Sequence, residues 1–528
     1  MAKFGLLFTT LLAIAIAIKA ESDPHDFFSQ RLGQSMLRTM LDNGMATDNS
    51  AVPADELNPN FWRKSANDEI QKRLADKLNT NKAKNVIFFL GDGMSLSTIT
   101  AARILKGQRQ GNPGEESQLS FEKFPYTGLS RTYCTNAQVA DSACTSTAYL
   151  TGVKTNILSL GVGPNVNYND CEASMDPAND LTSLYDWAQA AGKSTGFITT
   201  TTLTHASPTG GYAHVSNRMW ECDTDVRTYL QDSYTSDCKD IATQLITEEP
   251  GRKLDFIMGG GAGKFLPKTM IDPFGNPGER SDGKNLLSEW QRRHPGGLFV
   301  SSRKQMEAIN LEQTTSVMGI FQSKLMNFHQ HATESEPTLS EMTETGIKFL
   351  SKDDDGFFIF IEGGLIDYGN HYNKPGLSLD ETLEFERAIE LARNLTDPED
   401  TLIVVTADHA HPLSISGYPE RGNNILDVNE IGFDTNGVHY ATLNYAAGPE
   451  QYLDESGNRI ELKGQFGSPD FIFPSYISSD SGVHSGDDVG VFASGPWEHL
   501  FRGVLQQNTL PHLMAYAACI GDGAKSCD

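Results

Sequence analysis

The residues of this chain that could bind metal ions stand at the ends of short apolar runs. Asp92 follows "NVIFFLG", Glu362 follows "GFFIFI", and Asp408 follows "TLIVVTA". Each of these carboxylates alone would be a helix cap more often than a ligand. Three together, with histidines close by, favour a metal site, because ligands in open α/β sheets bind beyond the carboxyl ends of the strands.

Histidines accompany these carboxylates at short spacings. Asp367 and His371 are four residues apart in "IEGGLIDYGNH", so on one helical turn they share a face and can bind one ion. Three further histidines stand in "TADHAH" and "SGVHSGDD", namely His409, His411 and His484. Carboxylates with imidazoles suit zinc, and a set of oxygen ligands suits magnesium.

A serine stands at the start of a predicted helix. In "VADSACTSTAYLTG", residues 139–152, Ser142 precedes a run of small residues and helix formers that ends at Gly152. A hydroxyl is a poor nucleophile until a base, a lowered pKa or a metal activates it. This stretch contains no base, so whatever activates Ser142 must come from elsewhere in the chain.

The apolar runs also indicate the fold class. Short β-branched and aromatic runs alternate with long helical or loop stretches, which predicts buried parallel strands and an α/β core. The runs are "NVIFFL", "STGFIT", "LDFIMGG", "GFFIFIE", "TLIVVTAD" and "DVGVFASG". Residues 418–480 are rich in Gly, Asn, Asp and Pro, and we expect them to form an insertion or small subdomain.

The two ends of the chain indicate export. Residues 1–20 contain an apolar stretch behind Lys3, which predicts a secretory signal peptide that is too short for a membrane span. Residues 21–54 are irregular, and we expect an arm or a removable segment. The C-terminal "AACIGDGAKSCD" lacks the hydrophobic tail of a lipid-anchor signal. We therefore expect a secreted, extracellular protein with no membrane anchor.

Composition excludes several classes of protein. A hydrophobic content of 38% argues against a chain that is mainly membrane-embedded or mainly disordered. The 68 acidic and 42 basic residues give a formal charge of -26, the wrong sign for nucleic-acid binding. Seven cysteines in an exported chain predict disulfides, and the odd number leaves at least one cysteine free or paired between chains. We expect the free one to be Cys144.

Six segments, in this order, resemble the signature segments of the alkaline phosphatases: "FFLGDGM", "DSACTSTAYLTGVKTN", "THASPTGGYAHVSNR", "EGGLIDYGNH", "VTADHAH" and "GVHSGDDV". The resemblance is close to animal secreted and surface forms and covers about residues 55–528. It implies a doubly wound, mostly parallel sheet flanked by helices. Residues 55–417 and 481–528 would form the catalytic domain, and 418–480 a crown-like insertion. The N-terminal arm would help to form a homodimer.

The resemblance also implies the chemistry. It implies a metal-dependent phosphomonoesterase that hydrolyses phosphate monoesters at alkaline pH and releases inorganic phosphate, with two zinc ions and one magnesium ion. Ser142 matches the nucleophile, which zinc activates and which forms a phosphoserine. Arg218 matches the arginine that binds two phosphate oxygens, for which its planar fork is suited. His205 matches a histidine that supports magnesium through water.

The metal ligands implied by the resemblance fall into three sets. They are Asp92, Asp408 and His409 for the zinc at the serine; Asp367, His371 and His484 for the second zinc; and Asp92, Ser207 and Glu362 for magnesium. Tyr368 stands where relatives have a histidine or lysine, which bears on turnover and pH optimum rather than on the reaction class. Gln322 stands where animal forms have an acidic calcium ligand, so no calcium site is carried over.

The covalent modifications follow partly from the resemblance. By position, Cys171–Cys238 and Cys519–Cys527 match disulfides of the family. Cys134 and Cys222 have no counterparts, and a third bridge between them is the remaining expectation. Asn394, in Asn-Leu-Thr, is a possible glycosylation acceptor in an exported chain.

Three other functions are weighed against this hypothesis. A phosphodiesterase could share the metal core, but Arg218 addresses oxygens that a second ester group would obstruct. A sulfatase needs a Cys/Ser-x-Pro-x-Arg motif, and "SACTS" lacks its proline and arginine. A binding or storage protein on a decayed phosphatase scaffold would be expected to have lost Ser142, Arg218 or a zinc ligand, and all of them are present.

Overall fold

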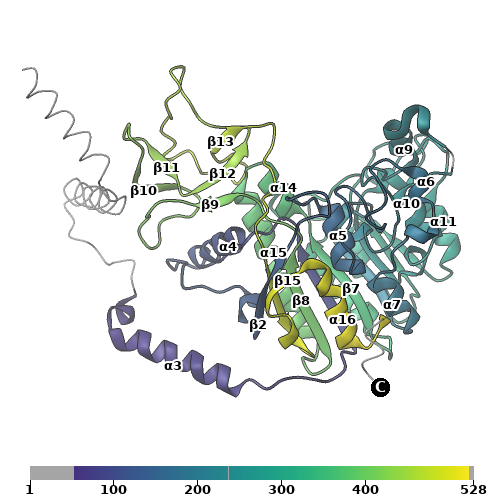
Figure 1. The fold of residues 1–528 in the computed structure, drawn as a ribbon, viewed down its shortest axis with the longest axis horizontal. Helices are drawn as coiled ribbons and strands as arrows, with labels where there is room; N and C mark the ends of the chain where they lie inside the picture. Colours follow the sequence, from purple (N-terminus) through teal and green to yellow (C-terminus); the bar gives the residue numbers. More distant parts are fainter. Residues whose placement is uncertain (1–52, 236, 522–528) are drawn as a thin grey trace, which may run out of the picture.

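The computed structural model of the protein describes residues 53–235 and 237–521. Its centre is a ten-stranded sheet (Figure 1). In order across the sheet, the strands are β15 (Gly503–Gln506), β2 (Tyr126–Arg131), β14 (Val489–Ser494), β8 (Thr401–Ala407), β1 (Asn85–Gly91), β7 (Phe357–Gly363), β3 (Ser194–Thr202), β4 (Phe256–Gly260), β6 (Val317–Ile320) and β5 (Leu298–Val300). The predicted signal peptide and nearly all of the predicted arm lie outside the described residues.

The strands from β8 to β5 all run parallel to one another. The predicted α/β class and mostly parallel sheet are confirmed, and the six apolar runs form β1, β3, β4, β7, β8 and β14. The expectation of a parallel strand was wrong for β14, which is antiparallel to both β8 and β2. An apolar run does not encode strand direction, because both faces of β14 are buried as they are in the parallel strands.

The strand β1 shows how the sheet forms two cores. Val86, Phe88 and Leu90 belong to one buried cluster, and Ile87 and Phe89 belong to the other. Alternate side chains of a strand point to opposite faces, so both faces of the sheet are covered. This double burial explains why the strand is a continuous apolar run rather than an alternating one.

Helices cover both faces, as a doubly wound fold requires (Figure 1). One core packs against α4 (Leu96–Arg109), α12 (Arg303–Glu307), α13 (Leu339–Leu350), α14 (Leu365–His371) and α15 (Pro375–Leu395). The other packs against α5 (Ser142–Thr151), α7 (Leu184–Ala190), α9 (Asp223–Leu230), α10 (Ile241–Thr247), α11 (Leu286–Arg293) and α16 (Leu510–Ala518).

Two small sheets stand beyond one end of the main sheet, in light green in Figure 1. The first contains β9 (Leu413–Ile415), β12 (Leu443–Gly448) and β13 (Ser475–Ser478). The second pairs β10 (Val428–Phe433) with β11 (His439–Ala441). Four of these strands lie within residues 418–480, whereas β9 precedes residue 418. That residues 418–480 form an insertion stays a prediction. We call residues 413–478 the small-sheet unit.

The helix α3 (Pro59–Ala75) projects from the main body at the purple end of Figure 1. Asn58 caps it, because its side chain accepts a hydrogen bond from the backbone N–H of Asn60. Every residue of α3 is exposed, including the large side chains of Phe61 and Trp62. Across residues 53–235 and 237–521, no helix combines the length and the apolar character that crossing a membrane requires.

The described residues contain the disulfides Cys134–Cys144 and Cys171–Cys238. The expectations that Cys144 is free and that Cys134 pairs with Cys222 were wrong. Cys144 lies on the first turn of α5, only ten residues from Cys134, whereas Cys222 is a buried free thiol at the start of α9. Cys519 ends α16, and its predicted partner Cys527 lies outside the described residues. That pair stays a prediction.

A buried arginine joins two segments on the α10 side of the sheet. The Arg280 side chain is fully buried, and it donates hydrogen bonds to Asp240, the cap of α10, and to Asp282. Removing one member of a buried ion pair leaves the other charge unpaired in a medium of low polarity. Arg280 is therefore a site where stability can be tested apart from activity.

We predict that Arg280→Leu lowers the free energy of unfolding by about 3–5 kcal/mol, because Asp240 and Asp282 lose their partner. The control is Arg292→Leu, which breaks an exposed pair with Glu289 and should leave the free energy of unfolding nearly unchanged. Urea unfolding followed by tryptophan fluorescence measures both. Equal small losses in the two variants would contradict the prediction.

Candidate active site and metal centre

The register of the main sheet brings three predicted carboxylates to one edge. Asp92 and Asp408 each directly follow the last paired residues of β1 and β8. Glu362 lies in β7, where it pairs with Leu90 of β1. The three carboxylates have no exposed surface, so their charges must be compensated inside the protein.

Beside them, His371 and His484 face each other. Each Nδ1 lies within hydrogen-bond distance of a backbone carbonyl, at 2.7 Å from Gly482 for His371 and 2.8 Å from Ala140 for His484. A carbonyl only accepts, so each Nδ1 carries the proton and each Nε2 presents a lone pair. The two Nε2 atoms are 2.9 Å apart, and Asp367 lies 3.3 Å from the Nε2 of His371. Lone pairs that converge in this way fit a shared cation.

A second group of ligand atoms surrounds His409. Its Nε2 lies 3.4 Å from Asp92 Oδ1, 3.2 Å from Asp408 Oδ2 and 3.2 Å from the hydroxyl of Ser142. Ser142 is the first residue of α5, as the sequence predicted, and Asp141 caps that helix. His409, from the end of β8, therefore places a candidate metal ligand beside Ser142 that the sequence around the serine does not contain.

A third group combines oxygen atoms. The Ser207 hydroxyl donates to Asp92 Oδ2 at 3.2 Å, and the Thr199 hydroxyl donates to Glu362 Oε2 at 2.5 Å. Ser207 lies in the short helix α8 (Ala206–Thr209), directly after His205. Asp92 Oδ1 and Glu362 Oε1 are buried and have no hydrogen-bond partner. Buried acceptors without a donor are costly, and a cation would satisfy them.

The pKa values of the buried carboxylates and of His409 also favour a bound cation. Burial raises the pKa of Glu362 and of Asp408 to about 7, and raises that of Asp92 well above its usual range, where the charge of Asp408 adds to the effect. Burial also holds the pKa of His409 well below its usual range, so its imidazole is neutral and able to bind a metal. The residues therefore fit a cluster of divalent ions, which would replace protons on the carboxylates.

Arg218 is held by two neighbours beside Ser142. Its Nη1 donates to Asp141 at 3.1 Å, and its Nη2 lies 3.2 Å from His205 Nε2. Burial and then the charge of Arg218 lower the pKa of His205 to about 3, so His205 is neutral and its Nε2 accepts from the guanidinium. The guanidinium plane is therefore fixed on both sides, in a position where it can bind an anion near the serine.

The family model described as Alkaline phosphatase matches residues 83–520. The chain belongs to the alkaline phosphatase family. It is 42% identical over 485 residues to the membrane-bound alkaline phosphatase of Bombyx mori, covering 90% of this chain and 88% of the relative. It is 41% identical over 495 residues to the tissue-nonspecific isozyme of Homo sapiens, covering 92% and 93%.

Solved structures show the same fold. The alkaline phosphatase from the Antarctic bacterium TAB5 aligns with a TM-score of 0.57 and 23% identity, over 84% of this chain and 99% of that one. The family and the identity to animal relatives make this protein an alkaline phosphatase, whose substrates are phosphate monoesters. Metal cofactors are a property of the family, and the three ligand groups give them candidate sites.

Sequence reasoning assigned no role to two residues of this phosphatase that contact the site. His411 is buried, and its Nε2 lies 2.5 Å from Asp367 Oδ1. Burial opposes ionisation of Asp367, but attraction to the neighbouring His371 imidazole and the hydrogen bond from His411 hold its pKa well below its usual range. Asp141 both caps α5 and binds Arg218. His411 is visible in the "TADHAH" motif, but only the fold shows that its partner is Asp367.

The glycine in "GDGM" is required by the crowding around this site. Gly93 has a φ of 65°, and a Cβ there would stand 2.7 Å from the His411 ring and 2.8 Å from Asp367 Oδ1. Its N–H donates to Asp408 Oδ1 at 2.9 Å. A side chain at position 93 would therefore displace two of the groups that line the metal centre.

Tyr368 lines a large cavity next to this site. The cavity has a volume of about 900 Å³, and His205, Tyr368, Glu221 and Lys264 are among its lining residues. The Tyr368 and His205 ring centroids are 6.1 Å apart. Burial raises the pKa of Tyr368 above its usual range. Through His205, which contacts Arg218, the cavity adjoins the candidate site.

We predict that His411→Leu weakens zinc binding by about 10- to 100-fold, because Asp367 loses the hydrogen bond that orients it. Competition with a fluorescent zinc chelator measures the affinity. The matched control is His439→Leu in the small-sheet unit, where the imidazole pairs with the half-exposed Glu461. An unchanged affinity in the His411 variant would show that Asp367 does not depend on it.

Proposed function

We propose that this alkaline phosphatase acts at alkaline pH through a phosphoserine intermediate on Ser142. The observation that carries the proposal is the position of the Ser142 hydroxyl. It lies 3.2 Å from His409 Nε2 at the N-terminus of α5, with Arg218 held by Asp141 on the same side. The first turn of a helix favours a bound anion, because its amide groups and dipole point toward the ligand.

We assign the ions as two zinc and one magnesium. Asp92, Asp408 and His409 would hold the zinc at the serine, and Asp367, His371 and His484 the second zinc. Asp92, Ser207 and Glu362 would hold magnesium, with His205 and Thr199 beside them. When bound, such ions supply positive charge that favours the ionised forms of the attacking and leaving oxygens. The mixed nitrogen and oxygen groups support zinc, and the oxygen group supports magnesium.

The residues of the chain then carry two displacements. The Ser142 oxygen attacks phosphorus and its proton passes to solvent. The bond from phosphorus to the ester oxygen breaks, and the departing alkoxide takes up a proton from solvent to leave as the alcohol. Arg218 binds two of the remaining phosphoryl oxygens through its fork, where charge is concentrated in the transition state. Water then attacks the phosphoserine from the opposite side, restoring the serine hydroxyl and releasing inorganic phosphate.

We further propose that the protein works outside the cell as a homodimer. The disulfides Cys134–Cys144 and Cys171–Cys238 support an oxidising compartment. The apolar side chains that α3 exposes, such as Phe61 and Trp62, support a role for this helix in packing on a second copy. Asn394 is exposed at the end of α15, where a glycan could be attached.

We predict that Ser142→Ala lowers kcat for p-nitrophenyl phosphate by at least about a thousandfold while zinc still binds, because only the nucleophilic oxygen is removed. Steady-state rates and metal content by mass spectrometry measure the two effects. Ser288→Ala, on the exposed side of α11, is the control and should keep full turnover. A Ser142 variant with near-normal turnover would remove the serine from its proposed role.

We also predict that metal removal abolishes turnover reversibly. Chelation should lower hydrolysis of p-nitrophenyl phosphate by at least about a hundredfold, because both displacements develop charge on oxygen. Zinc and magnesium together should restore it, with higher rates toward pH 10 than at pH 7. The diester bis-p-nitrophenyl phosphate should be hydrolysed far more slowly. A preference for the diester would favour a phosphodiesterase of the same superfamily instead.

A further inference from the structure

The segment between β2 and α5, residues 132–141, contacts the site at two points. The carbonyl of Ala140 accepts from Nδ1 of His484, at 2.8 Å. The carboxylate of Asp141 accepts from Arg218 at 3.1 Å and from the backbone N–H of Leu158 at 3.0 Å. We call residues 132–141 the nucleophile loop, because it leads directly into Ser142. Its position therefore determines where a metal-binding imidazole and the phosphate-binding guanidinium lie.

The nucleophile loop has little regular structure of its own. It contains no helix or strand, and much of its contact with the rest of the chain comes from exposed polar groups. The Thr135 hydroxyl donates to Asn156, and the N–H of Ile157 donates to the side chain of Asn136. Exposed hydrogen bonds of this kind exchange readily with water and hold a segment weakly. A stronger restraint is needed to fix Ala140 and Asp141.

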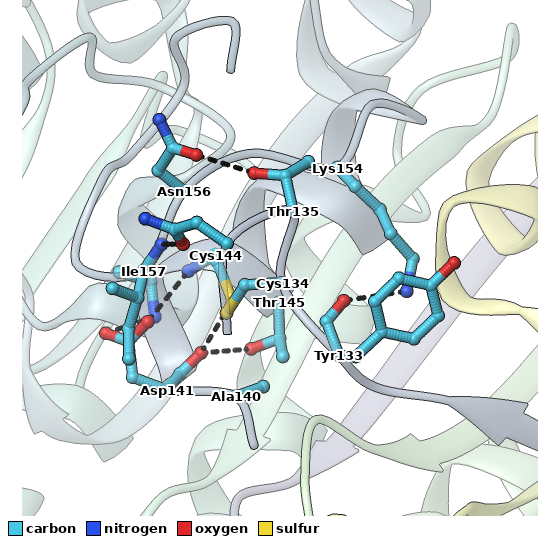
Figure 2. Close-up of a disulfide and its surroundings, with 12 residues drawn as sticks. Tyr133, Cys134, Thr135, Ala140, Asp141, Cys144, Thr145, Lys154, Asn156 and Ile157 are labelled. Atoms are coloured by element: carbon cyan, nitrogen blue, oxygen red, sulfur yellow. Dashed lines mark hydrogen bonds between the residues drawn. A yellow bond between two sulfur atoms is a disulfide. The ribbon is translucent and has the colours of Figure 1, made fainter. Parts of the chain in front are cut away.

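The Cys134–Cys144 disulfide provides that restraint (Figure 2). It joins the start of the nucleophile loop to the first turn of α5, so Ala140, Asp141 and Ser142 all lie inside the closed ring. Both cysteines are buried, in a small apolar cluster with Ala140. Figure 2 shows the bridge beside Asp141, with the hydrogen bonds of the loop around it.

We propose that the Cys134–Cys144 disulfide is a positioning cross-link of the active site. It holds Ala140 and Asp141, next to Ser142, where they contact His484 and Arg218. The proposal rests on the catalytic roles assigned above to Ser142, Arg218 and His484. Opening the bridge would change none of those three residues, but it would free the nucleophile loop that positions them. Displacements of about 1 Å in such groups can cost about a hundredfold in rate.

The other disulfide offers a matched control. Cys171–Cys238 joins α6 (Cys171–Ser174) to the residues before α10 and spans 67 positions. Its cysteines hydrogen-bond Ser174 and Thr235 rather than residues of the metal centre. In Figure 1, α6 and α10 lie at the far side of the molecule from the small sheets. The ring that this bridge closes includes Arg218, but Asp141 and His205 hold that side chain directly. We therefore expect this bridge to support stability without aligning the site.

The test compares Cys134→Ala/Cys144→Ala with Cys171→Ala/Cys238→Ala in the full-length, metal-loaded protein. Assays of p-nitrophenyl phosphate hydrolysis and inhibition by inorganic phosphate are run well below the melting temperature of each variant. We expect the first variant to lose about 5- to 50-fold in kcat and to bind phosphate about three-fold or more weakly, with its zinc content unchanged. The second should melt at a lower temperature but keep both constants within about twofold of the wild type.

Two outcomes would overturn the proposal: both constants within twofold of wild type in the Cys134 variant, or equal losses in the two variants. If the double alanine variant does not fold, Cys134→Val/Cys144→Ala keeps the apolar cluster filled and is assayed in its place. Graded reduction of the wild type at fixed free zinc is a second measurement, and turnover should return on reoxidation. A wild type that does not hydrolyse p-nitrophenyl phosphate would instead refute the proposed function. If the wild type is active, a difference between the two variants reports on the disulfide alone.

Discussion

His371 and His484 direct their Nε2 lone pairs at each other across 2.9 Å, next to one carboxylate and close to three more that are buried. In a dry interior this concentration of acceptors is unfavourable unless positive charge is supplied. The structure keeps the acceptors together nevertheless, by backbone carbonyls that fix both histidine tautomers. The remaining features of the site serve to gather these groups and to place a serine and an arginine beside them.

The register of the main sheet brings most of these groups together. Parallel pairing places the ends of β1, β7 and β8 side by side, so residues more than 300 positions apart in the chain become neighbours. The large apolar clusters on both faces make that register rigid. Loops then add what strands cannot: Gly93 allows the backbone to pass close to His411, and Asp141 joins the cap of α5 to Arg218.

Much of this arrangement could be predicted from the sequence, because long apolar runs and short-spaced motifs are local signals. The runs of β1, β7 and β8 and the helical spacing of Asp367 and His371 are of this kind. The short strands β5 and β6 and the direction of β14 gave no local signal, since they depend on which neighbour is present. The partners of His411 and Asp141 are tertiary contacts, and the cysteine pairing cannot be read from order alone.

The small-sheet unit joins the main body at the metal centre itself. His411 stands two residues before β9, and His484 follows β13 by a few residues, so the polypeptide leaves and re-enters the main body through this one pocket. Occupancy of the pocket and docking of the unit are therefore thermodynamically linked. Binding of an ion by His484 should therefore favour docking of the small-sheet unit, and undocking of the unit should weaken the binding of that ion.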